Sequence, residues 1–566
     1  MSHKRKSSSS DVLRGEKHKK EGEVRMKKGK MRKFVSMAVA GAMVMQCGIC
    51  TAFAGSGGGM ASGVQKLDGY KMVEVPTNII SYENDMVMTY IQEFANITQV
   101  PHPSYHTKEL AKYLEVWAEA RGIQAETDTY GNVIMNVPAT KGYEKAPLVA
   151  FQGHIDMVPA VAEGVTHNWE KDPLDLLWTS NSVKADGTSL GADNGSGVAF
   201  MLTYMDYKDE YKHGPLRFIF TADEEVGLLG AHGLDAKHVA DVVYLINVDG
   251  GYGGATISCA GGKLIEFSRE AEWEAMPSDS VLYHMEFNGL IGGHSANVGG
   301  GKANALVKMA NAMLALDQAG VEFNMVSFEG GSANNAIPSK SVASIAVKKA
   351  DVEKVNATMD RFAKLFKDSY EAVEKNYTFT YGVAEGKANK VLSNEVSVAL
   401  AQLMSTVPNN IHTLMATTTG TESSSNVGMM IWGEDKVGFS IFPRSSSTYA
   451  LEQIMMADKA LAELTGFDME VTVSFATWPM KAENKLADKA SALFFEMTGE
   501  EFKLAAIHGG VECGEFAEKN ENMYILATGV SGGSAGHTPE ETMNFDMVEK
   551  SVDYLVKLAE KLAVEG

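Results

Sequence analysis

The sequence predicts an α/β fold, with a mostly parallel sheet flanked by helices and interrupted by an inserted α+β domain. Short apolar runs typical of buried strands, such as 148–151 and 217–221, alternate with segments of helical spacing such as 194–205. This alternation is typical of parallel strands joined by crossover helices. The pattern changes after Gly254 and returns after Trp478, so we expect the chain between them to form the insertion.

Each predicted element rests on its local periodicity. In the first α/β part we expect helices at 86–95, 108–121, 194–205 and 225–234, and strands at 133–137, 148–151, 217–221 and 242–248. In the insertion we expect strands at 264–268, 282–287, 342–347, 413–418, 437–442 and 469–475, and helices at 303–318, 352–372 and 451–464. In the last part we expect helices at 485–497 and 544–564 and strands at 503–507 and 523–527.

The length of 566 residues predicts more than one folded unit. The predicted segments, in chain order, are a basic extension with a signal peptide (1–54), a linker (55–80), the first α/β part (81–255), the insertion (256–476) and the second α/β part (477–566). An internal duplication within the insertion is a further expectation, because its strand–helix–strand pattern occurs twice.

The N-terminal residues have the composition of a leader. Residues 26–33 (MKKGKMRK) are basic, 34–49 are mostly apolar and small, and 52–54 (AFA) resemble a cleavage site. The sequence therefore predicts a signal peptide and a protein that is secreted, at the cell surface or periplasmic. A retained membrane anchor formed by an uncleaved leader is the alternative.

Charge and cysteine content exclude two classes of protein. The formal net charge of −21 argues against nucleic acid as a partner. Only Cys259 and Cys513 lie outside the leader, which is too few for a disulfide framework. These two cysteines form one bridge or none, and the folded body depends on its apolar core.

The motif that organises the chain is GHID, which follows the apolar run LVAFQ. His154 and Asp156 are two residues apart, so on a continuing strand they face the same side. This side lies at the carboxyl end of the strand, where open α/β sheets bind their ligands. An imidazole with a neighbouring carboxylate is a common metal-binding pair, since the carboxylate orients the imidazole. Two solvent-facing polar residues are the alternative.

Further acids and histidines follow other predicted strands or precede helices. They are Asp193 in GADNG, the adjacent Glu224 and Glu225, Asp249 in NVDGG, His508 and Glu512 in HGGVE, and His537 in AGHTPE. Such carboxylates gathered at one sheet edge would repel one another without cations. Two histidines with several carboxylates and no thiolate fit two divalent ions.

We therefore expect two Zn²⁺ ions per chain, with Mn²⁺ or Co²⁺ as alternatives. Two ions about 3.5–4 Å apart activate water and stabilise an oxyanion. Asp193 is the natural bridge between them. Of Glu224 and Glu225, one can bind metal while the other acts as general base, and the residues alone leave that choice open.

The ordered motifs GHIDMVPA, LGADNGSGVA, TADEEVGLLGA, NVDGG, GGHSA and GHTPEE resemble the di-zinc exopeptidase family that includes aminoacylase, glutamate carboxypeptidase and bacterial dipeptidases. IHGGVECGEF and TESSSNVG make the resemblance strongest to its carnosinase-like aminoacyl-histidine (Xaa-His) dipeptidase branch. The similarity covers residues 80–566 and leaves out the leader. It implies that the α/β parts form a zinc-peptidase catalytic domain and that the insertion is a lid.

The resemblance also implies a role for each site residue. His154 and Asp249 would bind one zinc, Glu225 and His537 the other, and Asp193 would bridge them. Catalytic roles fall to three residues: Glu224 as general base, Asp156 as the group that orients His154, and His294 in the lid as the group that polarises the scissile carbonyl.

Three more residues are candidates for substrate binding. Arg444 could contact a substrate carboxylate in a bidentate manner, with an ordinary surface arginine as the alternative. Glu512 could receive the substrate amino group, with a buried structural glutamate as the alternative. Asn334 lies in the lid with Arg444 as a further candidate.

Taken together, these features predict a metal-dependent hydrolase of dipeptides, a dipeptidase with Xaa-His-like or broad specificity. An N-acyl amino acid amidohydrolase or a tripeptidase would share the same zinc ligands. A non-catalytic protein that binds metal or peptide at the cell surface is a third possibility. The partner is a small peptide, with no nucleic acid, and the chain is a monomer or a homodimer.

Overall fold

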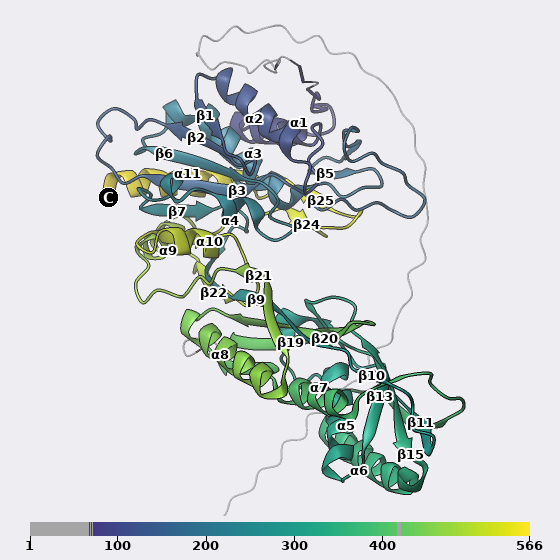
Figure 1. Cartoon of the computed structure of the whole chain (residues 1–566). Coiled ribbons are helices and arrows are strands. Elements are labelled where there is room, and N and C mark those ends of the chain that lie inside the picture. Colours follow the sequence, from purple (N-terminus) through teal and green to yellow (C-terminus); the bar gives the residue numbers. More distant parts are fainter. Residues whose placement is uncertain (1–66, 68, 71, 416–419, 566) are drawn as a thin grey trace, which may run out of the picture. The chain divides into compact units, whose positions relative to one another are not determined.

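The computed structural model describes residues 67, 69–70, 72–415 and 420–565 (Figure 1). The leader and most of the predicted linker lie outside the described residues, as does the end of the strand predicted at 413–418. The described start of that strand belongs to β18 (Asn410–Leu414).

An eight-stranded sheet forms the centre of the α/β part. Its spatial order is β1 (Gln124–Thr127), β2 (Val133–Val137), β6 (Leu216–Thr221), β3 (Val149–His154), β7 (Tyr244–Asn247), β23 (Tyr524–Ala527), β8 (Gly254–Cys259) and β22 (Lys503–Ile507). The central pairs β6–β3, β3–β7 and β7–β23 are parallel, and so is the outer pair β8–β22. The predicted mostly parallel sheet is confirmed. Antiparallel pairing occurs at β1–β2, β2–β6 and β23–β8.

Both faces of this sheet are buried. Along β6, Phe218 and Phe220 point into one hydrophobic core, while Ile219 between them points into another. Phe151 and Ala150 of β3 divide in the same way. Continuous apolar runs are expected for strands covered on both sides.

Helices cover both faces of this sheet, as Figure 1 shows. The first core is completed by α1 (Asp85–Ile97), α2 (Lys108–Glu119), α3 (Ala192–Asp206), α9 (Lys485–Thr498) and α11 (Val548–Glu565). The second core is completed by α4 (Leu229–Gly233) and α10 (Cys513–Lys519). A smaller antiparallel sheet has the order β24 (Gly533–Ser534), β25 (Thr542–Asn544), β5 (Ser182–Ala185) and β4 (Leu176–Trp178).

Residues between β8 and α9 form two further antiparallel sheets around a core of their own, whose residues lie between 265 and 467. One sheet has the order β13 (Phe323–Gly330), β15 (Ser341–Lys348), β11 (Ser280–Asn288) and β16 (Thr378–Ala384). The other has the order β18, β19 (Thr421–Trp432), β20 (Lys436–Ser445), β9 (Gly261–Glu270) and β21 (Asp468–Phe475). Two short pairs complete it, β10 (Trp273–Glu274) with β17 (Val391–Leu392) and β12 (Gly293–His294) with β14 (Ala336–Ile337).

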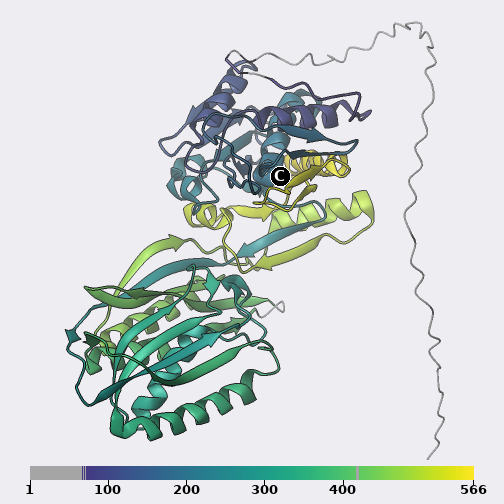
Figure 2. The same cartoon turned by 90° about the vertical axis from the view of Figure 1, so that its right-hand side faces the viewer.

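Helices α5 (Ala305–Gln318), α6 (Val352–Tyr370), α7 (Asn394–Thr406) and α8 (Thr448–Thr465) gather on one side of these strands (Figures 1 and 2). Short 3₁₀ turns occur at Lys208–Glu210, Ala236–His238, Ser295–Asn297 and Lys349–Asp351. Backbone hydrogen bonds in both directions between Cys259 and Trp478 pair the chain where it leaves the eight-stranded sheet with the chain where it returns. The boundaries 256–476 for an inserted lid stay a prediction.

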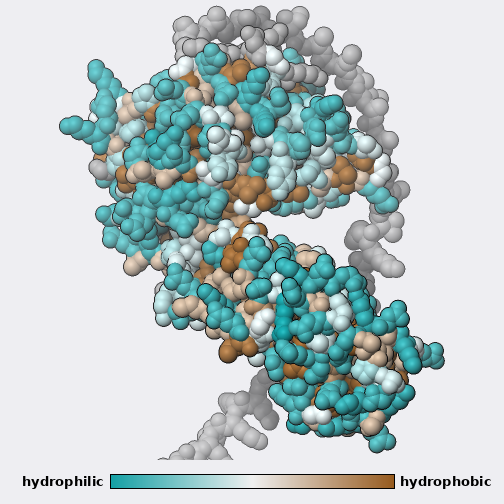
Figure 3. All heavy atoms as spheres, viewed as in Figure 1, coloured by the Kyte–Doolittle hydropathy of each residue, from teal (hydrophilic) through white to brown (hydrophobic). Residues whose placement is uncertain are grey.

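Because apolar side chains are buried in these cores, the face of the molecule in Figure 3 is covered mainly by hydrophilic side chains. Within the described part of the chain, no helix has both the length and the apolar character that crossing a membrane requires.

Two predicted helices differ from the structure. The helix expected at 225–234 is reduced to α4, because Gly227 and Leu228 have positive φ angles of 120° and 58° that interrupt a helix. The helix expected from residue 544 begins at Val548, because 542–544 pair with β5 as strand β25.

Candidate metal centre and active site

The candidate site lies at the carboxyl ends of three neighbouring parallel strands, β6, β3 and β7. His154 is the last residue of β3 and pairs with Thr221 at the end of β6. Glu224 and Glu225 follow β6, and Asp249 follows β7. Because parallel strands end at the same edge, residues distant in sequence meet there.

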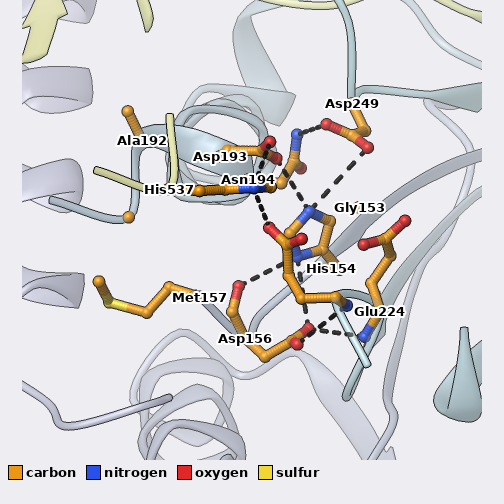
Figure 4. A network of polar contacts seen from close by, with 12 residues as sticks. Gly153, His154, Asp156, Met157, Ala192, Asp193, Asn194, Glu224, Asp249 and His537 are labelled. Carbon is orange, nitrogen blue, oxygen red and sulfur yellow. Dashed lines mark hydrogen bonds and ion pairs between the residues drawn. The ribbon is translucent and has the colours of Figure 1, made fainter. Parts of the chain in front are cut away.

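Three groups of these side chains could hold a metal ion, with the donor atoms of each group within 4.8 Å of one another. They are His154 with Asp193 and Asp249, Asp193 with Glu225 and His537, and His154 with Glu224 and Glu225. Figure 4 shows His154, Asp193, Asp249 and His537 pointing toward one another. The first two groups share Asp193. Nitrogen and carboxylate oxygen donors without sulfur suit zinc, manganese or cobalt.

Asp193 lies between the two histidines. Its Oδ1 is 3.0 Å from His154 Nε2, and its Oδ2 is 3.4 Å from His537 Nε2. His537 Nε2 also lies 2.7 Å from Glu225 Oε1, and His154 Nε2 lies 3.9 Å from Asp249 Oδ2. Each oxygen of Asp193 therefore faces a different ligand group, which is the geometry a bridging carboxylate needs.

The loop at the start of α3 places Asp193 and Asn194. Asn194 donates from Nδ2 to Asp249 Oδ1 at 2.9 Å, so it ties the α3 loop to the end of β7. Gly153 makes this packing possible, since a Cβ there would lie 2.4 Å from Asn194 Oδ1. The glycine before His154 thus has a steric reason that the sequence alone did not reveal.

Asp156 lies on the side of His154 that faces away from Asp193 and Asp249 (Figure 4). Its Oδ1 is 3.4 Å from His154 Nδ1, and its backbone carbonyl is 3.0 Å from the same nitrogen. With Nδ1 so engaged, Nε2 faces Asp193. Ser104 donates to Asp156 Oδ2 at 2.8 Å. Asp156 therefore has the position that its predicted orienting role requires, and the role itself stays a prediction.

The charges of the centre are strongly coupled. Burial lowers the pKa of His154, but hydrogen bonds with Asp156 and Asp193 outweigh it and leave the pKa well above its usual value. Hydrogen bonds with Asp193 and Glu225 raise the pKa of His537 to about 10. Burial, followed by the charge of Asp193, raises the pKa of Asp249 to about 7. The closely packed carboxylates thus favour a positive charge at this centre, as expected of a site that binds metal ions.

Two glutamates lie close to the candidate ligands: Glu512 is buried and Glu224 is half-buried. The pKa of Glu224 is raised to about 9, chiefly by burial; the charge of His154 opposes this shift, and the charges of Glu512 and Asp249 add to it. Burial also raises the pKa of Glu512 to about 7. Glu512 Oε2 accepts a hydrogen bond from Gln152 Nε2 at 2.5 Å. Its Oε1 has no hydrogen-bond partner among the described residues.

Arg444, predicted as a surface or substrate-binding arginine, is 8% exposed. Its guanidinium lies 4.2 Å from the centre of the Phe442 ring, and Nη2 lies 3.5 Å from Ser295 Oγ. No described carboxylate forms an ion pair with it. Burial lowers its pKa to about 10. The surface alternative is therefore wrong, because β20 carries Arg444 into the interior.

His294 and Asn334 lie in the same part of the chain as Arg444. His294 is exposed, and its Nδ1 accepts the backbone N–H of Ala296 at 3.1 Å. A neutral His294 therefore carries its proton on Nε2. It belongs to none of the three metal-ligand groups. Asn334 Oδ1 accepts a hydrogen bond from Ser440 at 2.7 Å, so part of this side chain stabilises the sheet around it.

A polar cluster beside Arg444 received no role from the sequence. Ser424 Oγ lies 2.6 Å from His508 Nε2, and His412 Nε2 lies 2.9 Å from Ser425 Oγ. Burial, followed by the charge of Arg444, lowers the pKa of His508 to about 4, so this imidazole is neutral at pH 7. Ser424 and Ser425 lie in the sequence motif TESSSNVG, and His508 lies in HGGVE. Neither motif by itself indicates that the two segments lie next to each other in the fold.

Two known proteins resemble this chain along most of its length, and others resemble a part of it. A cytosol non-specific dipeptidase of Escherichia coli is 30% identical over 476 residues, which cover 83% of this chain and 96% of that protein. The crystal structure of an aminoacylhistidine dipeptidase from Vibrio alginolyticus superposes with a TM-score of 0.77 at 29% identity and covers 86% of this chain and 97% of that one. Peptidase T of an Exiguobacterium strain is 30% identical over 199 residues, which cover 30% of this chain and 47% of that protein.

The prediction of a secreted, cell-surface or periplasmic protein with a signal peptide is wrong. It is contradicted by the Escherichia coli relative, which is named for the cytosol. The prediction rested on the composition of residues 26–54, which lie outside the described residues. A basic stretch before a short apolar run is a pattern of composition, and in this chain it led to the wrong localisation.

The predictions of an α/β metallopeptidase fold and of a peptide hydrolase are confirmed by the family comparison. Residues 150–561 match the sequence model of Peptidase family M20/M25/M40. This range includes every candidate ligand described above. The chain therefore belongs to peptidase family M20/M25/M40.

Proposed function

We propose that this peptidase hydrolyses dipeptides at a centre of two divalent metal ions, and that zinc is the native ion. The observation that carries the proposal is the position of Asp193 between two ligand groups, one oxygen toward His154 and the other toward His537. A single-ion site would not need a carboxylate shared in this way. The names of the Escherichia coli and Vibrio relatives support dipeptides as substrates.

In this proposal His154 and Asp249 would hold one ion, Glu225 and His537 would hold the other, and Asp193 would be shared between them. Two such ions, when bound, would polarise a scissile carbonyl and make water a stronger nucleophile. Asp156 and Ser104 keep His154 oriented. Asn194 keeps Asp249 beside the α3 loop.

Glu224 is the proposed general base. It shares the third candidate group with His154 and Glu225, and its backbone N–H donates to Asp156 at 2.8 Å, which holds the start of its side chain in place. Burial favours its protonated form, and cations nearby would oppose that effect. Glu224 would take a proton from the attacking water and deliver it to the leaving amine.

The two ends of a dipeptide carry opposite charges, and the chain offers a buried partner for each. Arg444 is a buried cation without a carboxylate partner among the described residues, and a substrate carboxylate would offset the cost of its burial. Glu512 has a buried oxygen that finds no hydrogen-bond partner within the described part of the chain, and this oxygen is suited to a substrate ammonium group. His294, with its proton on Nε2, would donate to the scissile carbonyl oxygen when residues 256–476 act as a lid.

The test is hydrolysis of β-Ala-His, Ala-His, Gly-Gly-Gly and N-acetyl-Met by the zinc-supplemented and the chelated protein. We expect cleavage of the two dipeptides alone, and loss of that cleavage on chelation. Cleavage of N-acetyl-Met would make the protein an amidohydrolase, and cleavage of Gly-Gly-Gly alone would make it a tripeptidase. Metal binding without turnover of any substrate would contradict the enzymatic proposal.

A further inference from the structure

We infer that Glu541 is a positioning residue that holds the two metal-ligand loops together, so that Asp193 can face both ligand groups. This inference rests on the proposed two-metal centre. It concerns a residue that follows His537 by four positions and is itself 2% exposed. Its carboxylate belongs to none of the metal-ligand groups of the described residues.

The carboxylate of Glu541 accepts four successive backbone N–H groups. Oε2 accepts those of Leu190 at 2.8 Å and Gly191 at 3.0 Å. Oε1 accepts those of Ala192 at 2.9 Å and Asp193 at 3.3 Å. The last of the four donors is the backbone of the shared ligand itself. Glu541 thus fixes the position of the Asp193 backbone, from which the Asp193 side chain extends.

The sequence of this loop explains why it needs an external acceptor. The first N–H groups of a helix have no partners within it, and a side chain at the N-cap normally accepts some of them. Gly191, the N-cap of α3, has no side chain and a φ of 73°, and the backbone angles of Asp193 and Asn194 are not helical. The N–H groups of residues 190–193 therefore precede the regular turns of the helix, and no side chain at the N-cap accepts them. Glu541 accepts them from another part of the chain instead.

Along the chain, Glu541 lies between His537, the second histidine of the centre, and strand β25. Thr542, the next residue, begins β25, which pairs with β5. The backbone N–H of Glu541 donates to the carbonyl of Thr538 at 3.1 Å, which closes the turn after His537. A shift of Glu541 would therefore move both the His537 loop and the Asp193 loop. This connection makes the two ligand groups form as one unit.

Glu540 offers a matched control. It is adjacent in sequence and carries the same charge, but it is exposed. We compare E541Q with E540Q. The amide of E541Q keeps one accepting oxygen and presents a donor to two of the four N–H groups, so half of the contacts are lost at nearly constant volume.

The experiment is titration of the metal-free full-length protein and both variants with Co²⁺, followed by visible absorption and electron paramagnetic resonance. We expect the wild type and E540Q to bind two magnetically coupled cobalt ions. We expect E541Q to bind its second ion at least about tenfold more weakly and to lose the coupling. A residue that only stabilised the fold would lower the thermal midpoint and leave the cobalt signals unchanged.

The outcomes separate the inference from the proposed function. If the wild type bound one ion, or two uncoupled ions, the two-metal centre itself would be wrong. If E541Q kept both ions, coupled and with wild-type affinity, only the inference would be overturned. If E541Q did not fold, E541D would decide: it keeps both oxygens but is one methylene shorter, and normal cobalt coupling in E541D would overturn the inference.

Discussion

Asp156 accepts the backbone N–H of Glu224 at 2.8 Å, and thereby joins the end of β3 to the loop that follows β6. The same carboxylate accepts the N–H of Glu225 at 3.2 Å and lies 3.4 Å from His154 Nδ1. One buried side chain thus contacts both His154, a proposed ligand of one ion, and the loop that carries Glu225, a proposed ligand of the other. Its removal should affect both ions.

Asp156→Asn should weaken metal binding about 10- to 100-fold, because the amide cannot accept from both N–H groups and also face His154 as an anion. Competition with a chromophoric chelator measures this affinity. Asp209→Asn, at an exposed aspartate, is the control. Unchanged metal affinity in Asp156→Asn would show that the carboxylate is not needed to orient His154.

Glu224→Gln and Glu225→Gln form a second pair, since the two residues are adjacent but have different proposed roles. Glu224→Gln should lower kcat about 10²- to 10⁴-fold while the protein keeps both ions, because only proton transfer is lost. Glu225→Gln should instead lower the metal content. Metal analysis of each purified variant, together with kcat, distinguishes them. Equal loss of metal from both variants would place Glu224 among the ligands.

Arg444→Met tests recognition of the substrate carboxylate. For a dipeptide with a free carboxylate, we expect kcat/KM to fall at least about 30-fold, equivalent to about 2 kcal/mol. For the corresponding dipeptide amide, wild type and variant should be alike. Thermal stability should not fall, because the variant removes a buried cation that no carboxylate of the described residues pairs with. An equal loss on both substrates would argue for a structural role of Arg444.

Asp458 on α8 predicts a pH dependence of stability. It is fully buried, and neither carboxylate oxygen has a hydrogen-bond partner among the described residues. Burial raises its pKa to about 7. The folded protein therefore binds a proton that the unfolded chain, with a pKa near 3.9, releases earlier, and stability falls as the pH rises from about 4 to about 7.

The expected size of this effect is on the order of 4 kcal/mol between the two limits, for about three pKa units. Asp458→Asn should remove that part of the pH dependence and raise the thermal midpoint at pH 8 relative to wild type. Glu452→Gln, at an exposed position on the same helix, is the control. Midpoints measured between pH 4 and pH 8 decide the question, and parallel curves for wild type and Asp458→Asn would refute it.

The central strands and most of the candidate ligands could be predicted from sequence. β3 and β7 are short apolar runs that stop at polar residues, and His154 and Asp249 mark those ends. Because parallel strands end at one edge, local pattern was enough to expect that these residues meet. Strand β19 was not expected, since Ser423, Ser424 and Ser425 are polar although the fold buries them. Their hydroxyl partners lie in other segments of the chain.

The sequence by itself determined most of the segments that become buried strands and helices, because apolar periodicity depends on neighbours along the chain. It also determined which acids and histidines stand at strand ends. Only the tertiary structure decided that Asp193 faces both His154 and His537, that Arg444 is buried, and that Glu541 holds the α3 loop. These relationships join residues up to about 350 positions apart, and hydrogen bonds at such separations follow from packing that no local pattern encodes.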